Sequence, residues 1–484
     1  MKRTYLIILA LILVLALGFT GCSEFNYGPI ATDADNLAAP VESNGGLVAK
    51  QGNYVYFVNG IGTAAMDNKF GEVIRGAIMR YTLDNNGDIV DDSLVTVVPK
   101  VVFSNYADCG FAIFGEWIYY VSPSVKIDKQ GNRLTNVVDF YRAKLDGTGT
   151  QKITEVENAS VEYVFTKDAL LYQSGSEIYS VDLTGDTFTV NTLAEEITGY
   201  MFPKLQDYDA DDTTVSIDEY VFYTKADEDD YESANHLYAV KPDGTGLVEI
   251  MGPNTYTDNA NDYRNRISVT PIKIENGVLY YNKAYAENGA LVAEGLYAGL
   301  YCYDLSDWSD EFEFDAANEV KLSINQVTSL HYVTDGVILV NTGSAMQLHN
   351  FGGADKINNV ASFASAIEIM SITDVEKTAD ALTFRATFTR AMSDDLYSYK
   401  FSYTIADGIY TVNEADLEQA VSITDTGTVS TYLNPEVIDG WFYFQNEWGY
   451  ISRVKIGTDE EPEMLGKMTT ADQEKYEESL EDEE

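Results

Sequence analysis

Short runs of aromatic and β-branched residues recur along the chain, and each run follows a turn-forming dipeptide. Gly52-Asn53 precedes the first run, and Asp439-Gly440 precedes the last. Residues of this kind favour the pleated, half-buried surface of a β-sheet. The pattern predicts eight short strands, about 45 to 63 residues apart, at 54–57, 117–120, 170–172, 220–223, 278–281, 337–340, 382–384 and 441–444.

A further strand follows in most repeats and often ends in a charged turn. The clearest copies lie at 78–81, 140–145, 178–182, 237–242 and 300–304. Asp146-Gly147 and Asp243-Gly244 close two of them, and such pairs supply the positive φ that a tight hairpin requires.

The repeat length predicts how these strands are assembled. One strand pair cannot bury its apolar face alone, so similar units must stack against each other. Units of about 50 residues with short strands and no helical periodicity are typical of β-propeller blades. A row of sandwich modules would need each of these small units to hold its own core. We therefore expect an all-β fold, a β-propeller of seven or eight blades over residues 45–460, each blade a small antiparallel sheet. The copies from the sixth onward are less regular.

The N-terminus has the layout of an export signal. Lys2 and Arg3 precede an apolar run over residues 6–17, which is too short for a stable membrane span. Gly21-Cys22 then resembles the lipobox of bacterial lipoproteins, although Phe19 stands where that family usually has Leu. The resemblance implies a signal peptide over 1–21 and a diacylglycerol on the Cys22 sulfur. Residues 22–44 are polar and predict a flexible tether. The alternative is an ordinary cleaved signal with a cysteine soon after it.

One further resemblance covers roughly residues 41 to 460. Gly45-Gly46-Leu47-Val48, the first strand run and the turn Asp146-Gly147-Thr148 resemble a group of bacterial lipoproteins. Their propeller domain has no established function and is described as similar to that of the low-density-lipoprotein receptor-related protein. The resemblance implies the fold and a location on the outer face of the cell membrane. It implies no activity.

Charge limits the classes of partner. The chain has 77 Asp and Glu against 31 Lys and Arg, a formal net charge of −46. Such a surface repels nucleic acid phosphates and disfavours docking on anionic lipid, so we expect no nucleic acid and membrane contact through the lipid anchor only. The acidity serves solubility at a crowded cell surface, or else attracts calcium or a cationic partner. Residues 461–484 are strongly acidic and predict a disordered tail.

Cysteines and histidines are few. With Cys22 lipidated, Cys109 and Cys302 remain, each in an apolar run, and two buried free thiols are expected rather than a disulfide scaffold. His236, His331 and His349 offer little material for a metal site or a catalytic triad.

Two groups of residues are candidates for binding. Asp207, Asp209, Asp211 and Asp218 loosely imitate the alternating carboxylates of a calcium loop, but Asp212 stands at the position that needs glycine. Calcium is therefore the one cofactor that we consider, and a solvated acidic loop is the alternative. Residues 84–88 are better interpreted as a hairpin turn.

Trp308 and Trp448 fall outside the repeated strands. Exposed aromatic rings make stacking platforms for sugars or peptides, so both are candidates for a ligand-binding face.

Together these features favour a lipid-anchored propeller that binds an extracellular ligand or an envelope protein. The main alternative is an envelope polysaccharide hydrolase or lyase with paired carboxylates, for which no pair stands out among so many. A third is an assembly or sensor component that binds a cationic partner.

Overall fold

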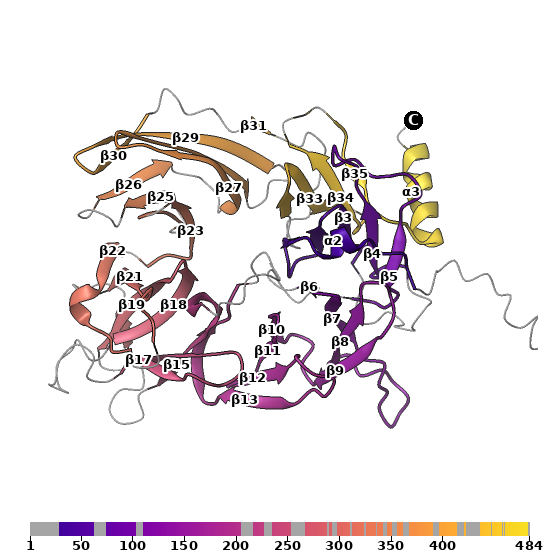
Figure 1. The fold of residues 1–484 in the computed structure, drawn as a ribbon, viewed down its shortest axis with the longest axis horizontal. Helices are drawn as coiled ribbons and strands as arrows, with labels where there is room; N and C mark the ends of the chain where they lie inside the picture. The colour runs from indigo at the N-terminus through magenta and orange to yellow at the C-terminus, as the bar shows by residue number, and fades with distance from the viewer. Residues whose placement is uncertain are drawn as a thin grey trace, which may run out of the picture.

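The computed structural model describes residues 29–61, 74–102, 110–204, 216–226, 235–252, 267–287, 290–292, 298–309, 312–323, 326–334, 336–341, 346–350, 356–361, 367–390, 396–413, 421–422, 436–446, 448–456, 458 and 460–482. Within these residues the strands form eight separate antiparallel sheets, and each sheet follows the chain order of its strands. The sheets stand in a ring, with β6, β10, β18, β23 and β27 toward the middle and β9, β13 and β17 at the rim (Figure 1). The predicted all-β propeller is confirmed, and it has eight blades.

The first four blades are built as follows. Blade 1 contains β1 (Val41–Glu42), β2 (Val48–Gln51), β3 (Tyr54–Val58), β4 (Ile78–Thr82) and β5 (Val95–Val98). Blade 2 contains β6 (Ala112–Phe114), β7 (Trp117–Pro123), β8 (Val138–Lys144) and β9 (Gln151–Val156). Blade 3 contains β10 (Glu162–Phe165), β11 (Ala169–Ser174), β12 (Glu177–Asp182) and β13 (Val190–Ala194). Blade 4 contains β14 (Ile197–Met201), β15 (Val221–Ala226), β16 (Asn235–Val240) and β17 (Val248–Met251), with the 3-10 turn η1 (Ile217–Glu219) before β15.

The last four blades follow the same order. Blade 5 contains β18 (Ile267–Glu275), β19 (Val278–Glu287), β20 (Ala290–Val292), β21 (Gly299–Asp304) and β22 (Val320–Ser323), with the 3-10 turn η3 (Ala316–Asn318) before β22. Blade 6 contains β23 (Ser329–Thr334), β24 (Val337–Asn341), β25 (Met346–Asn350) and β26 (Lys356–Ala361). Blade 7 contains β27 (Ile367–Lys377), β28 (Ala381–Arg390), β29 (Leu396–Ala406), β30 (Ile409–Val412) and β31 (Val421–Ser422). Blade 8 contains β32 (Glu436–Ile438), β33 (Trp441–Gln445), β34 (Ile451–Lys455) and β35 (Glu463–Met464).

Each of the eight predicted runs lies in the second strand of its four-stranded meander, which is β3 in blade 1 because the two-residue strand β1 precedes the meander there. That strand lies inside its sheet, with another strand on each edge. The adjacent blades cover both faces of the sheet, so the side chains on both sides of this strand are buried. Tyr54–Val58 shows the result, because all five residues are buried. This burial explains why the second strand carries the strongest apolar pattern in every repeat.

The turns before these strands have the predicted chemistry. Asn276 and Gly277 have φ of 51° and 76°, and Asp439 and Gly440 have φ of 50° and 78°. Two positive φ values in succession are the signature of a type I′ hairpin. Residues 84–88 also form a hairpin turn, since Leu83 pairs with Ile89 across it.

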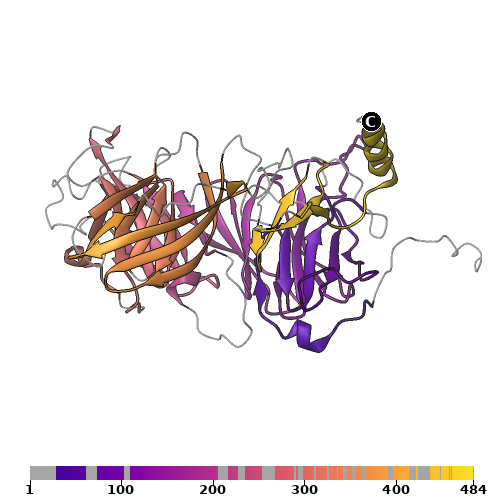
Figure 2. The ribbon, with the colours of Figure 1, turned by 90° about the horizontal axis from the view of Figure 1, so that it is seen from above.

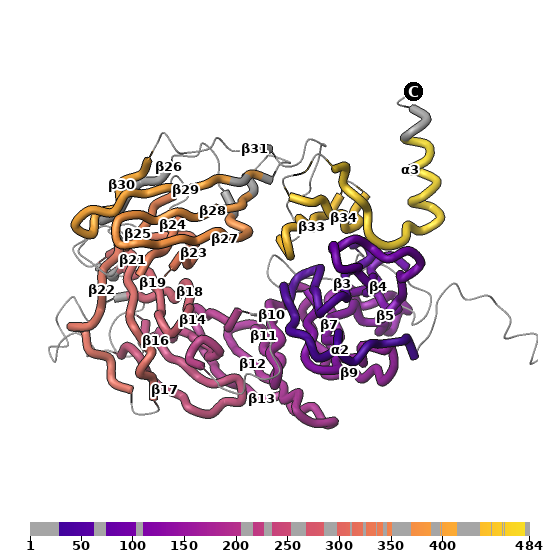
Figure 3. Tube along the Cα trace, turned by 45° about the horizontal axis from the view of Figure 1, so that its top comes forward, coloured from indigo at the N-terminus to yellow at the C-terminus, as the bar shows by residue number. Residues whose placement is uncertain are grey.

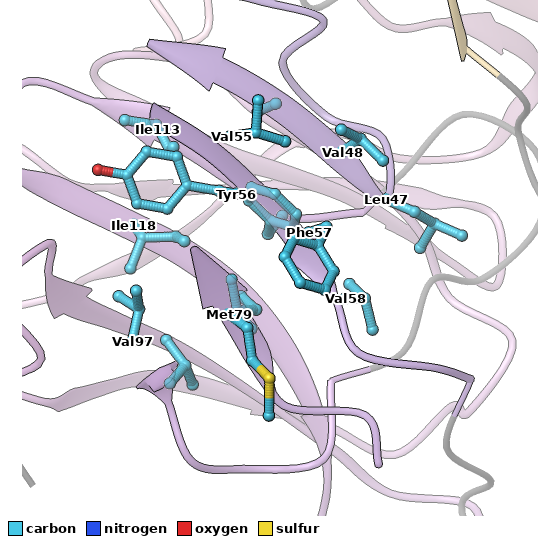
Figure 4. Packing of buried hydrophobic residues seen from close by; sticks show 14 of the residues in the cluster. Leu47, Val48, Val55, Tyr56, Phe57, Val58, Met79, Val97, Ile113 and Ile118 are labelled. Carbon is cyan, nitrogen blue, oxygen red and sulfur yellow. The ribbon is translucent and has the colours of Figure 1, made fainter. Parts of the chain in front are cut away.

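The core lies between blades rather than within them. Clusters of buried apolar residues join neighbouring blades, and the largest of them spans blades 8, 1 and 2. Figure 4 shows part of it, with Tyr56 and Phe57 of blade 1 packed among Met79, Ile113 and Ile118. The clusters therefore run around the whole ring.

No strand is shared between the first and last blades among the described residues, so side-chain and turn contacts close the ring. The Ile61 amide donates to the Gly449 carbonyl at 2.9 Å. Arg453 of β34 donates from Nη1 to the Gly87 carbonyl of blade 1 at 2.9 Å. Asn59 exchanges two hydrogen bonds with the backbone of Lys467.

The segment before blade 1 differs from the predicted flexible tether. From residue 29 onward it packs on the ring, because Ile30 is buried and its amide donates to the Asp146 carbonyl of blade 2. Asp33 caps the short helix α2 (Ala34–Leu37), which lies on one face of the disc, at the bottom of the view in Figure 2. Blade 1 accordingly begins at Val41, four residues before the predicted boundary.

The C-terminal segment also differs from the predicted disordered tail. After β35, Leu465 and Met468 are buried, and helix α3 spans Thr470–Asp482. Helix α3 projects from the side of the ring where blades 8 and 1 meet (Figure 3). Glu474, Glu477 and Glu478 of the helix are exposed, while Leu465 packs in the cluster shared by blades 8, 1 and 2.

Candidate ligand-binding site on the inner strands

The residues proposed for calcium do not form a site in the described part of the chain. Asp207, Asp209 and Asp211 lie outside the described residues, as does Cys22. Asp218 lies in η1, and its carboxylate accepts a hydrogen bond from the Gly277 amide at 3.0 Å. Asp218 therefore connects blade 4 to the first turn of blade 5. Among the described residues no group of three or more His, Cys, Asp or Glu side chains is placed to hold a metal ion.

Both candidate tryptophans pack against other aromatic rings. Trp308 lies edge-on to Tyr220 at 5.5 Å between ring centroids and stacks on Phe312 at 5.0 Å. Trp448 meets Tyr476 of α3 edge-on at 5.8 Å. In these positions Trp308 supports the junction of blades 4 and 5, and Trp448 supports the docking of α3.

The remaining thiol and two histidines belong to strands. Cys302 is a free, buried thiol in β21, and burial raises its pKa to about 12; Cys109 lies outside the described residues. His236 of β16 contacts Glu249 through Nδ1 at 2.8 Å. Burial lowers the pKa of His349 in β25 to about 4, so this ring is neutral. These positions give the three residues packing roles.

The inner strands of the blades differ at one register position, where some blades have a small apolar residue and others an ionisable one. In blades 1 and 2 the inner-strand residue opposite the third residue of the second strand is Ala49 or Ala112, and both are fully buried. The equivalent residues of blades 5, 6, 7 and 8 are Lys273, His331, Glu376 and Glu436. Four ionisable side chains thus replace small apolar ones on the inner strands of the ring.

Two of these residues belong to one cluster, which we call the axial cluster: Lys204, Lys273, Glu275 and His331. Lys273 and Glu275 lie two residues apart on β18, on one face of the strand, and form an ion pair. A register shift between Pro271 and Lys273 precedes them, and such irregularities change the direction of a side chain. Strand β18 lies beside β14, which leads to Lys204, and beside β23, which carries His331.

Neighbouring lysine charges lower the pKa of two groups in the axial cluster, Lys273 and His331. Burial lowers the pKa of Lys273, and the charge of Lys204 lowers it further, while Glu275 opposes both effects. Burial, together with the charges of Lys273 and Lys204, lowers the pKa of His331 to about 3. His331 is therefore a neutral imidazole, which both donates and accepts a hydrogen bond.

Glu436 has a different environment at the junction of blades 8 and 1. Its carboxyl group lies against Gly46, where an added Cβ would come within 1.5 Å of Oε1. Burial raises the pKa of Glu436 to about 8, although Ser43 and the backbone amides of Val48 and Leu47 oppose that rise. Both carboxyl oxygens of Glu436 are buried without a hydrogen-bond partner among the described residues. Glu436 of blade 8 thus packs against the Gly46 backbone of blade 1 as a carboxyl group that is largely protonated at pH 7.

The axial cluster can bind and orient an anionic group. Lysine ammonium groups act as point charges for oxyanions, and a neutral imidazole adds a hydrogen bond. Sequence reasoning missed this cluster because its members are scattered over 128 positions, from 204 to 331. A usable signal was present, since aligning the repeats on their second strands places Lys273 where Ala49 and Ala112 stand.

No family model matches the chain, and no curated protein matches its sequence. Among solved structures, the propeller domain of the Trilobed protease from Pyrococcus furiosus, described as having an open velcro topology, is 10% identical, with a TM-score of 0.34 over 77% of this chain and 96% of that one. AztD from Citrobacter koseri is 10% identical, with a TM-score of 0.33 over 82% of this chain and 96% of that one. An uncharacterised protein from Listeria monocytogenes is 9% identical, with a TM-score of 0.37 over 76% of this chain and 96% of that one.

Within the residues described here, no helix is both long enough and apolar enough to cross a membrane. The fold assignment depends on the eight meandering sheets and the clusters between them, and not on the weak likenesses above. On that evidence the chain is an eight-bladed β-propeller.

Proposed function

We propose that this protein is a lipid-anchored binding module of the cell envelope, and that it holds an extracellular ligand near the axis of its propeller. The observation that carries the binding role is the axial cluster. Lys273 is 15% exposed and Glu275 is 28% exposed, so two charged groups are held largely out of water at one point on the inner strands. Burying charges costs free energy, and positions at which a fold departs from apolar packing are often functional.

The location rests on the sequence. The apolar run ending before Cys22 and the small residue before that cysteine are what a lipoprotein signal requires. Two acyl chains give membrane attachment that is stable rather than transient. Residues 29–37 lie on the turn that precedes the second strand of blade 1, since the Asn53 amide donates to the Asn36 side chain. Residues 29–37 therefore lie on the face of the ring where β18 ends and its turn begins, and we propose that the anchor attaches from this face.

The anchor is tested by replacing Cys22. We expect Cys22→Ala to abolish lipidation, so that the protein leaves the membrane fraction without detergent or accumulates as the uncleaved precursor. The intact mass of the processed protein gives the direct measurement. Unchanged mass together with membrane retention would contradict the anchor.

Binding is tested on the body of the protein from Ser23 onward. A glycan array and a peptide array should identify at least one class of ligand, and we expect its binding to weaken in Lys273→Met. Turnover of a polysaccharide without retention of any array ligand would instead support the hydrolase alternative.

A further inference from the structure

We infer that residues 124–137, which we call the blade 2 hairpin, form a second membrane contact that docks on an anionic lipid surface beside the anchor. The hairpin joins β7 to β8. Its aliphatic side chains enter the boundary between headgroups and acyl chains, and its cations meet the lipid phosphates. The inference rests on the proposed membrane location. It replaces the expectation, drawn from net charge, that the lipid anchor is the only membrane contact.

The blade 2 hairpin has a defined structure that extends away from the ring. The Ser124 amide donates to the Val137 carbonyl at 3.0 Å. The Leu134 amide donates to the Lys126 carbonyl at 2.9 Å. At the tip, the Asp128 carboxylate accepts hydrogen bonds from two backbone amides of the turn. The hairpin projects past β9 at the rim of the ring (Figure 1), so it presents a fixed arrangement of side chains to a partner.

Two aliphatic side chains of the hairpin are exposed on one side. Val125 is 52% exposed and Ile127 is 65% exposed, which makes Ile127 the most exposed large apolar residue of the described structure. They lie two residues apart on one extended arm, so both point to the same side. Lys126 points to the other side, where it pairs with Glu155 of β9. Adjacent exposed apolar residues, unlike scattered ones, are typical of a protein or membrane interaction site.

The hairpin is basic in a strongly acidic chain. Three of residues 124–137 are cations and one is an acid, a net charge of +2 against −46 for the whole chain. The cations are Lys126, Lys129 and Arg133, and the acid is Asp128. Because the Debye length is about 8 Å at physiological ionic strength, a segment that projects from the rim presents its own charge rather than that of the body. Exposed aliphatic residues flanked by cations suit an anionic lipid surface.

The position of the hairpin relative to the anchor favours lipid as the occupant. The Ile30 amide donates to the Asp146 carbonyl just beyond one end of β8, and the hairpin leaves the other end. Strand β8 has 7 residues, which corresponds to a length of about 23 Å. The chain between Cys22 and residue 29 can extend over about 25 Å. A membrane that lies along the edge of blade 2 therefore meets both the anchor and the hairpin.

Vesicle partitioning of the body from Ser23 onward tests the inference without the anchor. We expect phosphatidylglycerol vesicles to retain at least about three-fold more protein than phosphatidylcholine vesicles. Ile127→Asp should lower the partition coefficient on phosphatidylglycerol by about ten-fold, because an aliphatic side chain is lost and a like charge approaches the lipid. Leu247→Asp is the matched control, since Leu247 is 57% exposed just before β17 of blade 4, and it should have no effect. Both positions are exposed, so neither variant should change the thermal midpoint.

A pair of charge reversals separates attraction from insertion. Lys129→Glu should weaken retention by phosphatidylglycerol vesicles several-fold and leave retention by phosphatidylcholine vesicles unchanged. Lys400→Glu makes the same change at an exposed position on β29 of blade 7, and it should alter neither.

An environment-sensitive dye gives a second readout in the anchored protein. The lipidated chain is reconstituted in phosphatidylglycerol vesicles, with Cys109→Ser and Cys302→Ser to leave one site for labelling. Dye attached to Ile127→Cys should shift its emission to the blue as it leaves water. The same dye on Leu247→Cys should keep the emission that it has in buffer.

The outcomes separate this inference from the proposed function. Absence of retention on phosphatidylglycerol, an unshifted dye at position 127, or equal effects of Ile127→Asp and Leu247→Asp overturns the membrane contact. A soluble dimer that Ile127→Asp dissociates would assign the hairpin to a second copy, and it overturns the contact as well. None of these results bears on the arrays or on the Cys22→Ala test. Failure of those two tests, in turn, overturns the binding module or the anchor and leaves the vesicle results on the body standing.

Discussion

Blade 8 meets its two neighbours in different ways. Toward blade 1 it contributes five buried residues to the largest apolar cluster of the molecule, namely Ile438, Trp441, Tyr443, Ile451 and Leu465. Toward blade 7 the cluster contains three buried residues, Phe442, Phe444 and Val454, with the partly buried Met370 against them.

The difference follows from chain connectivity. Blades 7 and 8 are consecutive in the chain, so the backbone keeps them close whether or not their side chains pack. Blades 8 and 1 are joined through the whole length of the ring, and closing a long loop costs conformational entropy. With no shared strand in the described structure, buried apolar area and polar contacts at this junction must offset that cost. We call it the closing junction.

Hydrogen bonds of Arg75 also hold the closing junction together, in addition to the apolar contacts. Arg75 donates to the carbonyls of Ile61 and Trp448, both at about 3 Å, and to the Asp472 carboxylate at 3.0 Å. One guanidinium thus joins blade 1, blade 8 and the start of α3. Its planar fork of donors suits such a threefold role better than an ammonium would.

The largest effect is expected from Arg453→Ala. The Arg453 side chain is 1% exposed, and its Cζ lies 3.9 Å from the centroid of the Trp441 ring. It donates hydrogen bonds to the Glu463 carboxylate and the Gly87 carbonyl. Removing it leaves a cavity and an unpaired carbonyl, so we expect a loss of about 3 kcal/mol in the free energy of unfolding. Denaturant unfolding followed by intrinsic fluorescence gives the measurement.

Arg385→Ala is the matched control. The Arg385 side chain is 34% exposed and pairs with Asp374, which is 71% exposed. Pairs of this kind contribute about 0 to 1 kcal/mol. Equal losses for the two variants would show that the closing junction has no special role.

The second prediction compares the two sides of blade 8 directly. Leu465→Ala removes a fully buried residue from the closing junction, and we expect a loss of about 2 to 3 kcal/mol. Met370→Ala removes a partly buried residue from the other side, and we expect about 1 kcal/mol. Thermal midpoints of both variants, measured side by side, should show the larger shift for Leu465→Ala; the reverse order would contradict the comparison.

The third prediction concerns pH. In the folded state the pKa of Glu436 is about 8, above its ordinary value of 4.5, so the folded protein binds a proton that the unfolded chain has released. The stabilisation is complete below pH 4.5 and is lost as the pH rises through 8. Linkage gives a loss of about 1 kcal/mol between pH 7 and pH 8 from this group.

Glu436→Gln isolates that contribution. The amide stays neutral at every pH, so the variant should lose less stability than the wild type between pH 7 and pH 8. Unfolding curves for both proteins across this range provide the test. Parallel pH profiles would mean that Glu436 is not the titrating group.

The fold was predictable from sequence because the second strand of each blade is covered on both faces. Its residues are apolar without interruption, as in Tyr54–Val58, and a positive-φ turn marks its start. The first and fourth strands border the axis and the rim, so they bear less consistent patterns. Glu162–Phe165 and Val190–Ala194 illustrate this, with exposed residues at one end. The second strands were therefore found, whereas the limits of blade 1 and blade 8 were not.

The candidate site was not predictable in the same way. Lys204, Lys273 and His331 belong to different repeats, and nothing local distinguishes them from other polar residues in strands. Their proximity arises only when blades 4, 5 and 6 take consecutive places in the ring. Trp308 and Trp448 show the opposite case. Both lie outside the repeated strands and were therefore considered for binding, yet Trp308 packs between blades and Trp448 packs against α3.

The smallest effect is expected from Asp472→Asn, which probes how firmly α3 belongs to the closing junction. Asp472 accepts hydrogen bonds from Tyr450, Thr469 and Arg75, all on its Oδ2. Asparagine keeps one acceptor oxygen but loses the charge, so we expect a loss of about 0.5 to 1 kcal/mol in overall stability. Hydrogen exchange should respond more clearly than global unfolding, because α3 is exposed and can detach locally. Faster exchange confined to residues 470–482 would identify α3 as a dependent element of the junction. Unchanged exchange there would mean that Leu465 and Met468 hold the helix without help from its first turn.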